Sequence, residues 1–228
     1  MPSIFGESLQ TMLYIFIIRL IIALTALPVH ECAHGYAALR MGDHTAERQG
    51  RLTLNPLAHF DPIGTTAIIL FGFGWAKPVP INPLNFRNPK KGMMLSALAG
   101  PMANIGLAFL SLVLYKLTPL LSVIGLGASF VSTLNLFFFY STAINISLAV
   151  FNLIPIPPLD GSNILLGFLP YKAIYWVQQH RQVISFVFLI LIFSDFLDTP
   201  LSYLQQLIFK GFMFLTNWVP LMVSGLTG

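Results

Sequence analysis

The stretch that decides the fold is Leu20-Ile21-Ile22-Ala23-Leu24-Thr25-Ala26-Leu27-Pro28-Val29-His30-Glu31-Cys32-Ala33-His34. Its first part is almost wholly apolar, and its last five residues read H-E-x-x-H. Residues four apart lie on one face of a helix, so the two histidines can bind one metal ion. The glutamate between them can reach a metal-bound water. The pattern therefore predicts a hydrolytic metal site within a membrane-spanning helix.

We expect this helix to cover residues 7–41 and to stop at Gly42. About 35 residues give a length of about 50 Å, which exceeds the ~30 Å hydrocarbon core of a bilayer. Its end must therefore emerge into water or bend, and Pro28 can kink the helix next to the metal motif.

The composition excludes most classes of soluble protein. The 228 residues are 56% hydrophobic and 9% charged, with a mean hydropathy of +0.77, whereas soluble domains carry about 25% charged residues. We expect one integral membrane domain over residues 1–228, with a core at 10–168 and C-terminal helices at 182–226. The net charge of +4 fits membrane orientation and not nucleic-acid binding, because no basic cluster with interleaved aromatic residues is present.

The predicted fold class is an all-α polytopic membrane protein with a small β or re-entrant region between its first and second core helices. The proline-rich region 43–91 contains one strongly apolar segment, 63–75, which is too short to span easily. Whether 63–75 and 201–222 span the membrane is left open. Further helices are expected at 92–115, 129–153, 183–197 and 201–222. A short helix that ends near residue 168 is expected after a proline-rich break.

The positive-inside rule favours the re-entrant interpretation of residues 63–75. With the first helix running outside to inside, nine of the twelve basic residues lie inside, and Lys116 is a clear exception. This orientation also places the histidine pair and Asp160 on the same, cytoplasmic side. The inside residues are Arg40, Arg48, Arg51, Lys77, Arg87, Lys90, Lys91, Lys172 and Arg181.

Asp160 is the leading candidate for a third metal ligand. Catalytic zinc takes three protein ligands and a water, so one ligand must be added to His30 and His34. Asp160 follows a helix that three prolines interrupt, and a carboxylate at membrane depth is costly without a cation. We therefore expect one Zn²⁺ per chain, with Glu31 as the general base that moves a proton from water to the leaving amine.

Three further polar residues are candidates with two possible roles. Asn104 and Asn152 each lie in an apolar helix, where they could form interhelical hydrogen bonds or could donate to a substrate carbonyl or an oxyanion. His59 lies in a proline-bounded loop; a structural hydrogen-bonding role is favoured over a role at the entrance of the site. The single cysteine, Cys32, is interpreted as a small apolar filler and excludes an internal disulfide.

Taken together, three motifs make the chain resemble the site-2 proteases, which are intramembrane zinc metalloproteases. The resemblance implies zinc binding by His30, His34 and Asp160, catalysis by Glu31, and substrates that are transmembrane helices cut within or near the bilayer. It also implies three core spans and a bacterial cytoplasmic membrane. We expect a minimal form, without a PDZ-like or nucleotide-sensing domain. The motifs are His30-Glu31-x-x-His34, Gly100-Pro101-x-x-Asn104 and Asn152-x-x-Pro155-x-Pro157-x-x-Asp160-Gly161.

Two other functions stay open on the sequence alone. One is a catalytically silent membrane protein that binds or transports zinc, although structural zinc sites normally have four protein ligands. The other is a zinc hydrolase that acts on lipid. The sequence identifies neither the substrate nor the oligomeric state.

Overall fold

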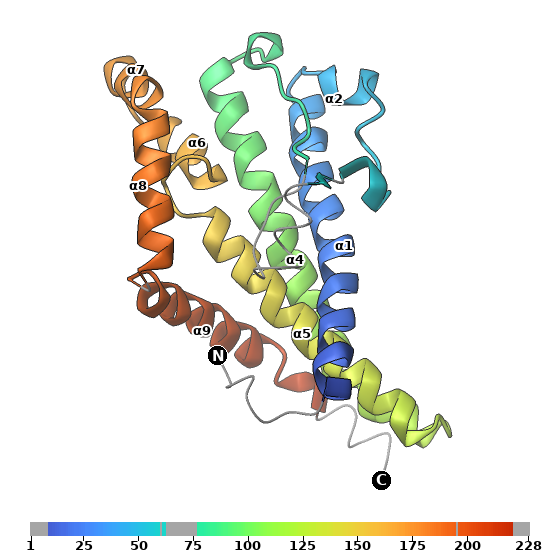
Figure 1. The fold of residues 1–228 in the computed structure, drawn as a ribbon. Helices are drawn as coiled ribbons and strands as arrows, with labels where there is room; N and C mark the ends of the chain where they lie inside the picture. Colours follow the sequence, from blue (N-terminus) through green and yellow to red (C-terminus); the bar gives the residue numbers. More distant parts are fainter. Residues whose placement is uncertain (1–8, 60, 63–76, 195, 221–228) are drawn as a thin grey trace.

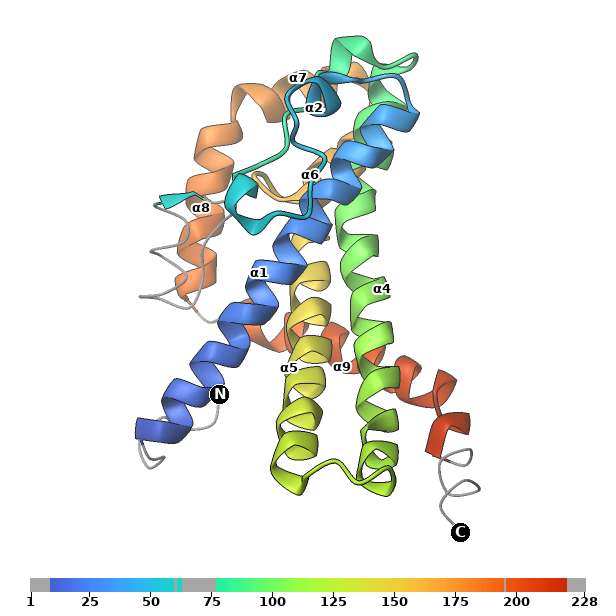
Figure 2. The same ribbon diagram turned by 90° about the vertical axis from the view of Figure 1, so that its right-hand side faces the viewer.

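Three long helices form the centre of the computed structural model, which describes residues 9–59, 61–62, 77–194 and 196–220. They are α1 (Leu9–Arg40), α4 (Pro89–Val123) and α5 (Ala128–Asn152). Helix α4 contacts both others, and the three run along one another in Figures 1 and 2. By length and composition, each could cross a membrane. The structure therefore confirms the helical, membrane-type core that the sequence predicts.

Helix α1 ends where the sequence predicts, and the turn that ends it has a specific geometry. Gly42 has a φ of +106°, a conformation that glycine adopts without strain. Its N–H donates to the Leu39 carbonyl, and the N–H of Asp43 donates to the Ala38 carbonyl. This is the Schellman pattern of a helix C-terminus. The turn fixes the position of Asp43, whose carboxylate accepts the N–H of Asn82 at 2.7 Å.

Helix α4 is longer at both ends than the predicted segment 92–115. It begins at Pro89 because the Asn88 side chain accepts the N–H of Lys91, which is an N-cap, and proline is favourable in the first turn. It continues to Val123 through Pro119. Proline is tolerated within membrane helices, so Pro119 does not mark an end.

Shorter helices surround this core (Figure 1). Helix α9 packs across α4 and α5 on a buried cluster of Ala108, Ile146 and Val150. Helices α6, α8 and α9 correspond to predicted segments, whereas α7 was not predicted. The surrounding elements are α2 (Thr45–Arg48), η1 (Pro56–His59), η2 (Pro83–Asn85), α6 (Asp160–Leu166), α7 (Tyr171–Gln179), α8 (Arg181–Phe193) and α9 (Asp198–Leu215).

The predicted β-structure between the first two core helices is not seen in the described residues. Between 43 and 91 these residues form α2, η1, η2, the first turn of α4 and otherwise mostly irregular backbone, and no described residue of this region is in a strand. Residues 77–82 do not form a ladder, and Pro78 and Pro80 have no N–H to donate to one. The apolar segment 63–75 lies outside the described residues.

Candidate metal centre

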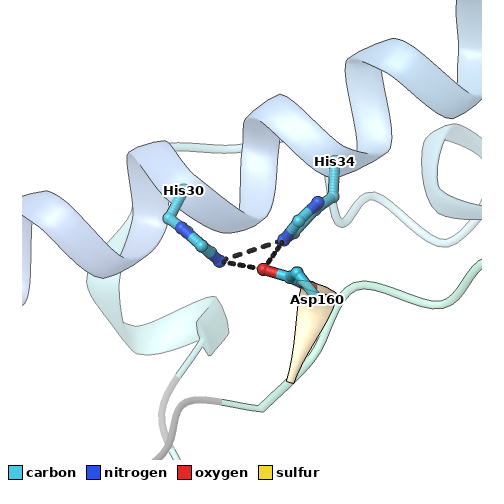
Figure 3. A group of neighbouring side chains, drawn as sticks. All are labelled: His30, His34 and Asp160. Atoms are coloured by element: carbon cyan, nitrogen blue, oxygen red, sulfur yellow. Dashed lines mark hydrogen bonds and ion pairs between the residues drawn. The ribbon is translucent and has the colours of Figure 1, made fainter. Parts of the chain in front are cut away.

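Two segments that are distant in sequence bring three potential ligands together (Figure 3). His30 and His34 lie one turn apart on α1, and Asp160 is the first residue of α6. Leu153 caps the end of α5, and the proline-rich stretch that follows leads directly into α6. The break that the three prolines impose thus returns the chain to α1 with the carboxylate of Asp160 facing the imidazoles.

The three ligand atoms form a nearly equilateral triangle. The Nε2 atoms of His30 and His34 are 3.0 Å apart, and Oδ2 of Asp160 lies 3.2 and 3.3 Å from them. Zinc–nitrogen and zinc–oxygen bonds of about 2.0–2.1 Å in a tetrahedron require ligand atoms about 3.3 Å apart. The triangle therefore has the size that a tetrahedral zinc ion needs.

Nδ1 of each imidazole, the nitrogen that is not part of the triangle, lies within hydrogen-bond distance of an acceptor. Nδ1 of His34 lies 2.7 Å from the Ser96 carbonyl, and Nδ1 of His30 lies 2.5 Å from Oδ1 of Asn104. With the protons on Nδ1, both Nε2 atoms present lone pairs toward the oxygen of Asp160. Three electron-pair donors that face one another in a buried site need a cation between them. This donor set fits a metal ion.

Asp160 is the acidic member of this candidate donor set. Its Oδ2 is buried and has no hydrogen-bond partner among the described residues, as expected for an oxygen that faces a cation. The two rings are 6% and 7% exposed. The two imidazoles are therefore shielded from bulk water.

Glu31 lies beside the triangle with one oxygen fixed. Its Oε2 accepts the backbone N–H of Val79 at 2.8 Å. No hydrogen bond from the described part of the chain reaches Oε1. Glu31, the histidine pair, Asp160 and Asn152 all line one cavity of about 500 Å³. The free carboxylate oxygen is thus available to a water molecule next to the metal ligands.

The other candidates take different positions. Asn152 lines the cavity, and its Nδ2 donates to the Leu148 carbonyl of its own helix. Asn104 is fully buried behind His30, and its Nδ2 donates to Asn145. His59 is not among the residues that line the cavity; it is 3% exposed, and its Nε2 donates to the Thr53 carbonyl.

Sequence reasoning missed several groups that support this site. Asn145 is buried and lies seven residues before Asn152, on the same helical face. That spacing is the sequence feature that could have identified Asn145. Asn163 lies one turn after Asp160 and also lines the cavity. The backbone groups of Val79 and Ser96 gave no signal in the sequence, because every residue carries them.

Comparison with known proteins agrees with this geometry. The chain is 41% identical over 177 residues to the "Putative zinc metalloprotease YwhC" of Bacillus subtilis (strain 168), covering 77% of this chain and 78% of that protein. The model of peptidase family M50 matches residues 116–194. This chain belongs to peptidase family M50. Membership confirms the resemblance to the site-2 proteases and the expectation of a membrane-embedded peptidase.

Other M50 relatives are more distant. The "Putative zinc metalloprotease Rip2" of Mycolicibacterium smegmatis is 33% identical over 169 residues, which cover 70% of this chain and 61% of that protein. Rip2 of Mycobacterium tuberculosis (strain H37Rv) is 33% identical over 165 residues, which cover 68% of this chain and 60% of that protein. No solved structure matches the chain. The M50 model match includes Asp160, while the histidine pair lies in the part of the chain before it.

Proposed function

We propose that this M50 peptidase is an intramembrane zinc metalloprotease that hydrolyses peptide bonds of transmembrane-helix substrates within or near the bilayer. The observation that carries the proposal is the triangle of His30, His34 and Asp160 beside Oε1 of Glu31, which receives no hydrogen bond from the described residues. The names of its relatives, which specify zinc metalloproteases, support the choice of metal. The three apolar helices support the membrane setting.

His30, His34 and Asp160 would hold the zinc ion, one per chain. When bound, zinc lowers the pKa of a coordinated water to about 7 and polarises the scissile carbonyl. Glu31 accepts the proton of the attacking water on Oε1 while Val79 holds Oε2, and it delivers that proton to the nitrogen of the leaving amine. Asn152, whose Oδ1 has no hydrogen bond from the described residues, is a candidate for contact with the substrate backbone.

The substrate must expose a peptide bond before it can react, because a membrane helix has its amides in hydrogen bonds. We propose that it unwinds and enters the cavity in extended form, beside the irregular backbone of residues 77–82. Within this region, Pro78, Val79 and Ile81 line the catalytic cavity. The positive-inside pattern favours a site on the cytoplasmic side, and the resemblance to the site-2 proteases implies a bacterial cytoplasmic membrane.

An open site favours catalysis over silent zinc binding. Among the described residues, His30, His34 and Asp160 are the group of His, Cys, Asp and Glu side chains that could hold a metal, without a fourth member. A structural zinc site would normally be closed by a fourth protein ligand. The adjoining cavity of about 500 Å³ leaves room for water and a substrate.

The test compares membrane-protein fragments from cells that produce the wild type, Glu31→Gln or Glu47→Gln. Glu47 is the matched control, because it lies on α2 outside the cavity and contacts His44. We expect specific fragments with the wild type and Glu47→Gln, and none with Glu31→Gln. Glu31→Gln should still bind zinc, because Glu31 is not a proposed ligand. Undiminished cleavage by Glu31→Gln would refute the catalytic assignment.

A further inference from the structure

A chain of buried side-chain amides connects α5 to His30 through α4. We propose that this relay, from Asn145 through Asn104, fixes the proton of His30 on Nδ1 and thereby makes both asparagines positioning residues of the metal site. The inference rests on the proposed function in one respect, which is that His30 is a zinc ligand.

The direction of every hydrogen bond in the relay follows from the bond at its α5 end, between Asn145 and Ser141. The Ser141 carbonyl can only accept, and it lies 2.9 Å from Nδ2 of Asn145. Oδ1 of Asn145 therefore faces Asn104 and accepts its Nδ2 at 2.9 Å. Oδ1 of Asn104 must then face His30, 2.5 Å from Nδ1. An amide oxygen only accepts, so Nδ1 of His30 must be the donor, and its Nε2 keeps a lone pair for the metal.

Burial makes this direction hard to reverse. Asn104 is 0% and Asn145 is 2% exposed, so water has little access to replace a lost partner. If either amide turned over, two donors or two acceptors would face each other in the interior. A reversed Asn104 would present Nδ2 to His30 and would favour the tautomer with the proton on Nε2, which cannot bind zinc through that atom.

The two histidines have the same tautomer, but different kinds of acceptor hold their Nδ1–H groups. His34 meets the Ser96 carbonyl of α4 directly, and Ser96 Oγ donates to the His34 carbonyl at 2.9 Å. Among the described residues, no main-chain carbonyl accepts from Nδ1 of His30. This nitrogen is connected to the Ser141 carbonyl only through the side-chain amides of Asn104 and Asn145. The relay thus makes the ligand geometry at His30 depend on the packing of three helices.

The first test replaces Asn145 and compares it with a matched asparagine. Asn135 also lies on α5 and donates to Thr118 Oγ1 of α4 at 2.7 Å, but it is not connected to His30. We expect Asn145→Leu to weaken zinc binding about 10- to 100-fold, the range for groups that orient a ligating histidine. Asn135→Leu should stay within about threefold of the wild type. Zinc affinity is measured on the full chain in detergent by competition with a chelator.

A second pair of variants separates the acceptor from packing. Asn104→Asp presents an acceptor to Nδ1 of His30 whichever way its carboxylate is turned, so it does not need Asn145 to orient it, although its second oxygen then faces Oδ1 of Asn145 without a hydrogen bond. Carboxylates commonly hold zinc-binding histidines in this way. We expect Asn104→Asp to retain zinc affinity, while Asn104→Leu should lose about 10- to 100-fold. ¹⁵N spectra of the histidine side chains should show the proton of His30 on Nδ1 in the wild type and Asn104→Asp, and a shift toward Nε2 in Asn104→Leu.

The outcomes are distinct. The relay is refuted if Asn145→Leu binds zinc as Asn135→Leu does, or if both Asn104 variants lose zinc equally. Should Asn145→Leu not fold, the Asn104 pair decides. His30→Ala tests the underlying assignment separately: if that variant keeps full zinc affinity, His30 is not a ligand and the proposed function fails, whatever the relay variants show.

Discussion

Replacing Gly100 by alanine should damage the metal site through direct contact with its ligands. Gly100 lies on α4 against the two imidazoles. A Cβ atom at this position would lie 2.4 Å from Cε1 and Nε2 of His34 and 2.7 Å from Cε1 of His30. Ordinary van der Waals contact begins at 3.4 Å. Both rings are buried and held at Nδ1, so they cannot turn away without losing those hydrogen bonds.

The size of the effect follows from this overlap. Restoring ordinary contact requires a movement of about 1 Å, several times the ~0.2 Å tolerance of metal–ligand distances. A misplacement of about 1 Å can also reduce a catalytic rate about 100-fold. We therefore expect Gly100→Ala to weaken zinc binding at least tenfold and to lower proteolysis about 100-fold. The higher helix propensity of alanine, worth about 1 kcal/mol, works in the opposite direction and does not affect the rings.

Gly106 on the same helix provides the control. A Cβ atom there meets nothing within 4 Å, so Gly106→Ala should keep zinc affinity and gain about 0.5–1 kcal/mol of stability. Zinc affinity by chelator competition and the thermal unfolding temperature are measured for both variants in detergent. Wild-type zinc binding by Gly100→Ala would show that the rings do not lie against α4 as described.

Three further variants test the surroundings of the site. Gly161→Ala should prevent correct folding of the turn before α6, because its Cβ would lie 2.3 and 2.4 Å from the carbonyl oxygens of Leu153 and Ile154; a low yield of monodisperse protein, compared with Gly106→Ala, is the measurement. Asp160→Ala should abolish high-affinity zinc binding while the helical circular dichroism spectrum is kept; unchanged zinc affinity would exclude Asp160 as a ligand. Burial opposes ionisation of Asp43, but hydrogen bonds from Thr45, Asn85 and Asn82 lower the pKa of its carboxyl below the ordinary 3.8. The ionised form therefore stabilises the fold fully above pH 3.8, and this contribution is lost as the pH falls through the lowered pKa. Asp43→Asn should be less stable than the wild type at pH 7, by about 1–3 kcal/mol, and the difference should shrink below pH 3.8 in denaturant titrations; a constant difference would contradict this.

The sequence was sufficient to predict which three side chains meet in the candidate metal centre and the helices that carry them. Periodicity placed His30 and His34 on one face, and the rarity of carboxylates in an apolar chain directed attention to Asp160. Element ends were less predictable. Helix α4 continues through Pro119 because membrane helices tolerate proline, and α7 was missed because its nine residues carry no long apolar run.

What the sequence could not predict is how the motif residues are oriented, and the reason is chemical. His34 is held by the carbonyl of Ser96, Glu31 by the N–H of Val79, and His30 by the carbonyl of Ser141 through the two asparagines. All three anchors are main-chain groups, which every residue offers, so no side-chain type marks them. Replacing Ser141 or Val79 by another residue that keeps the backbone path should therefore preserve the site. The positions that restrict the side chain are instead Gly100, where only hydrogen leaves room for the rings, and Asn104, where His30 requires a side-chain acceptor.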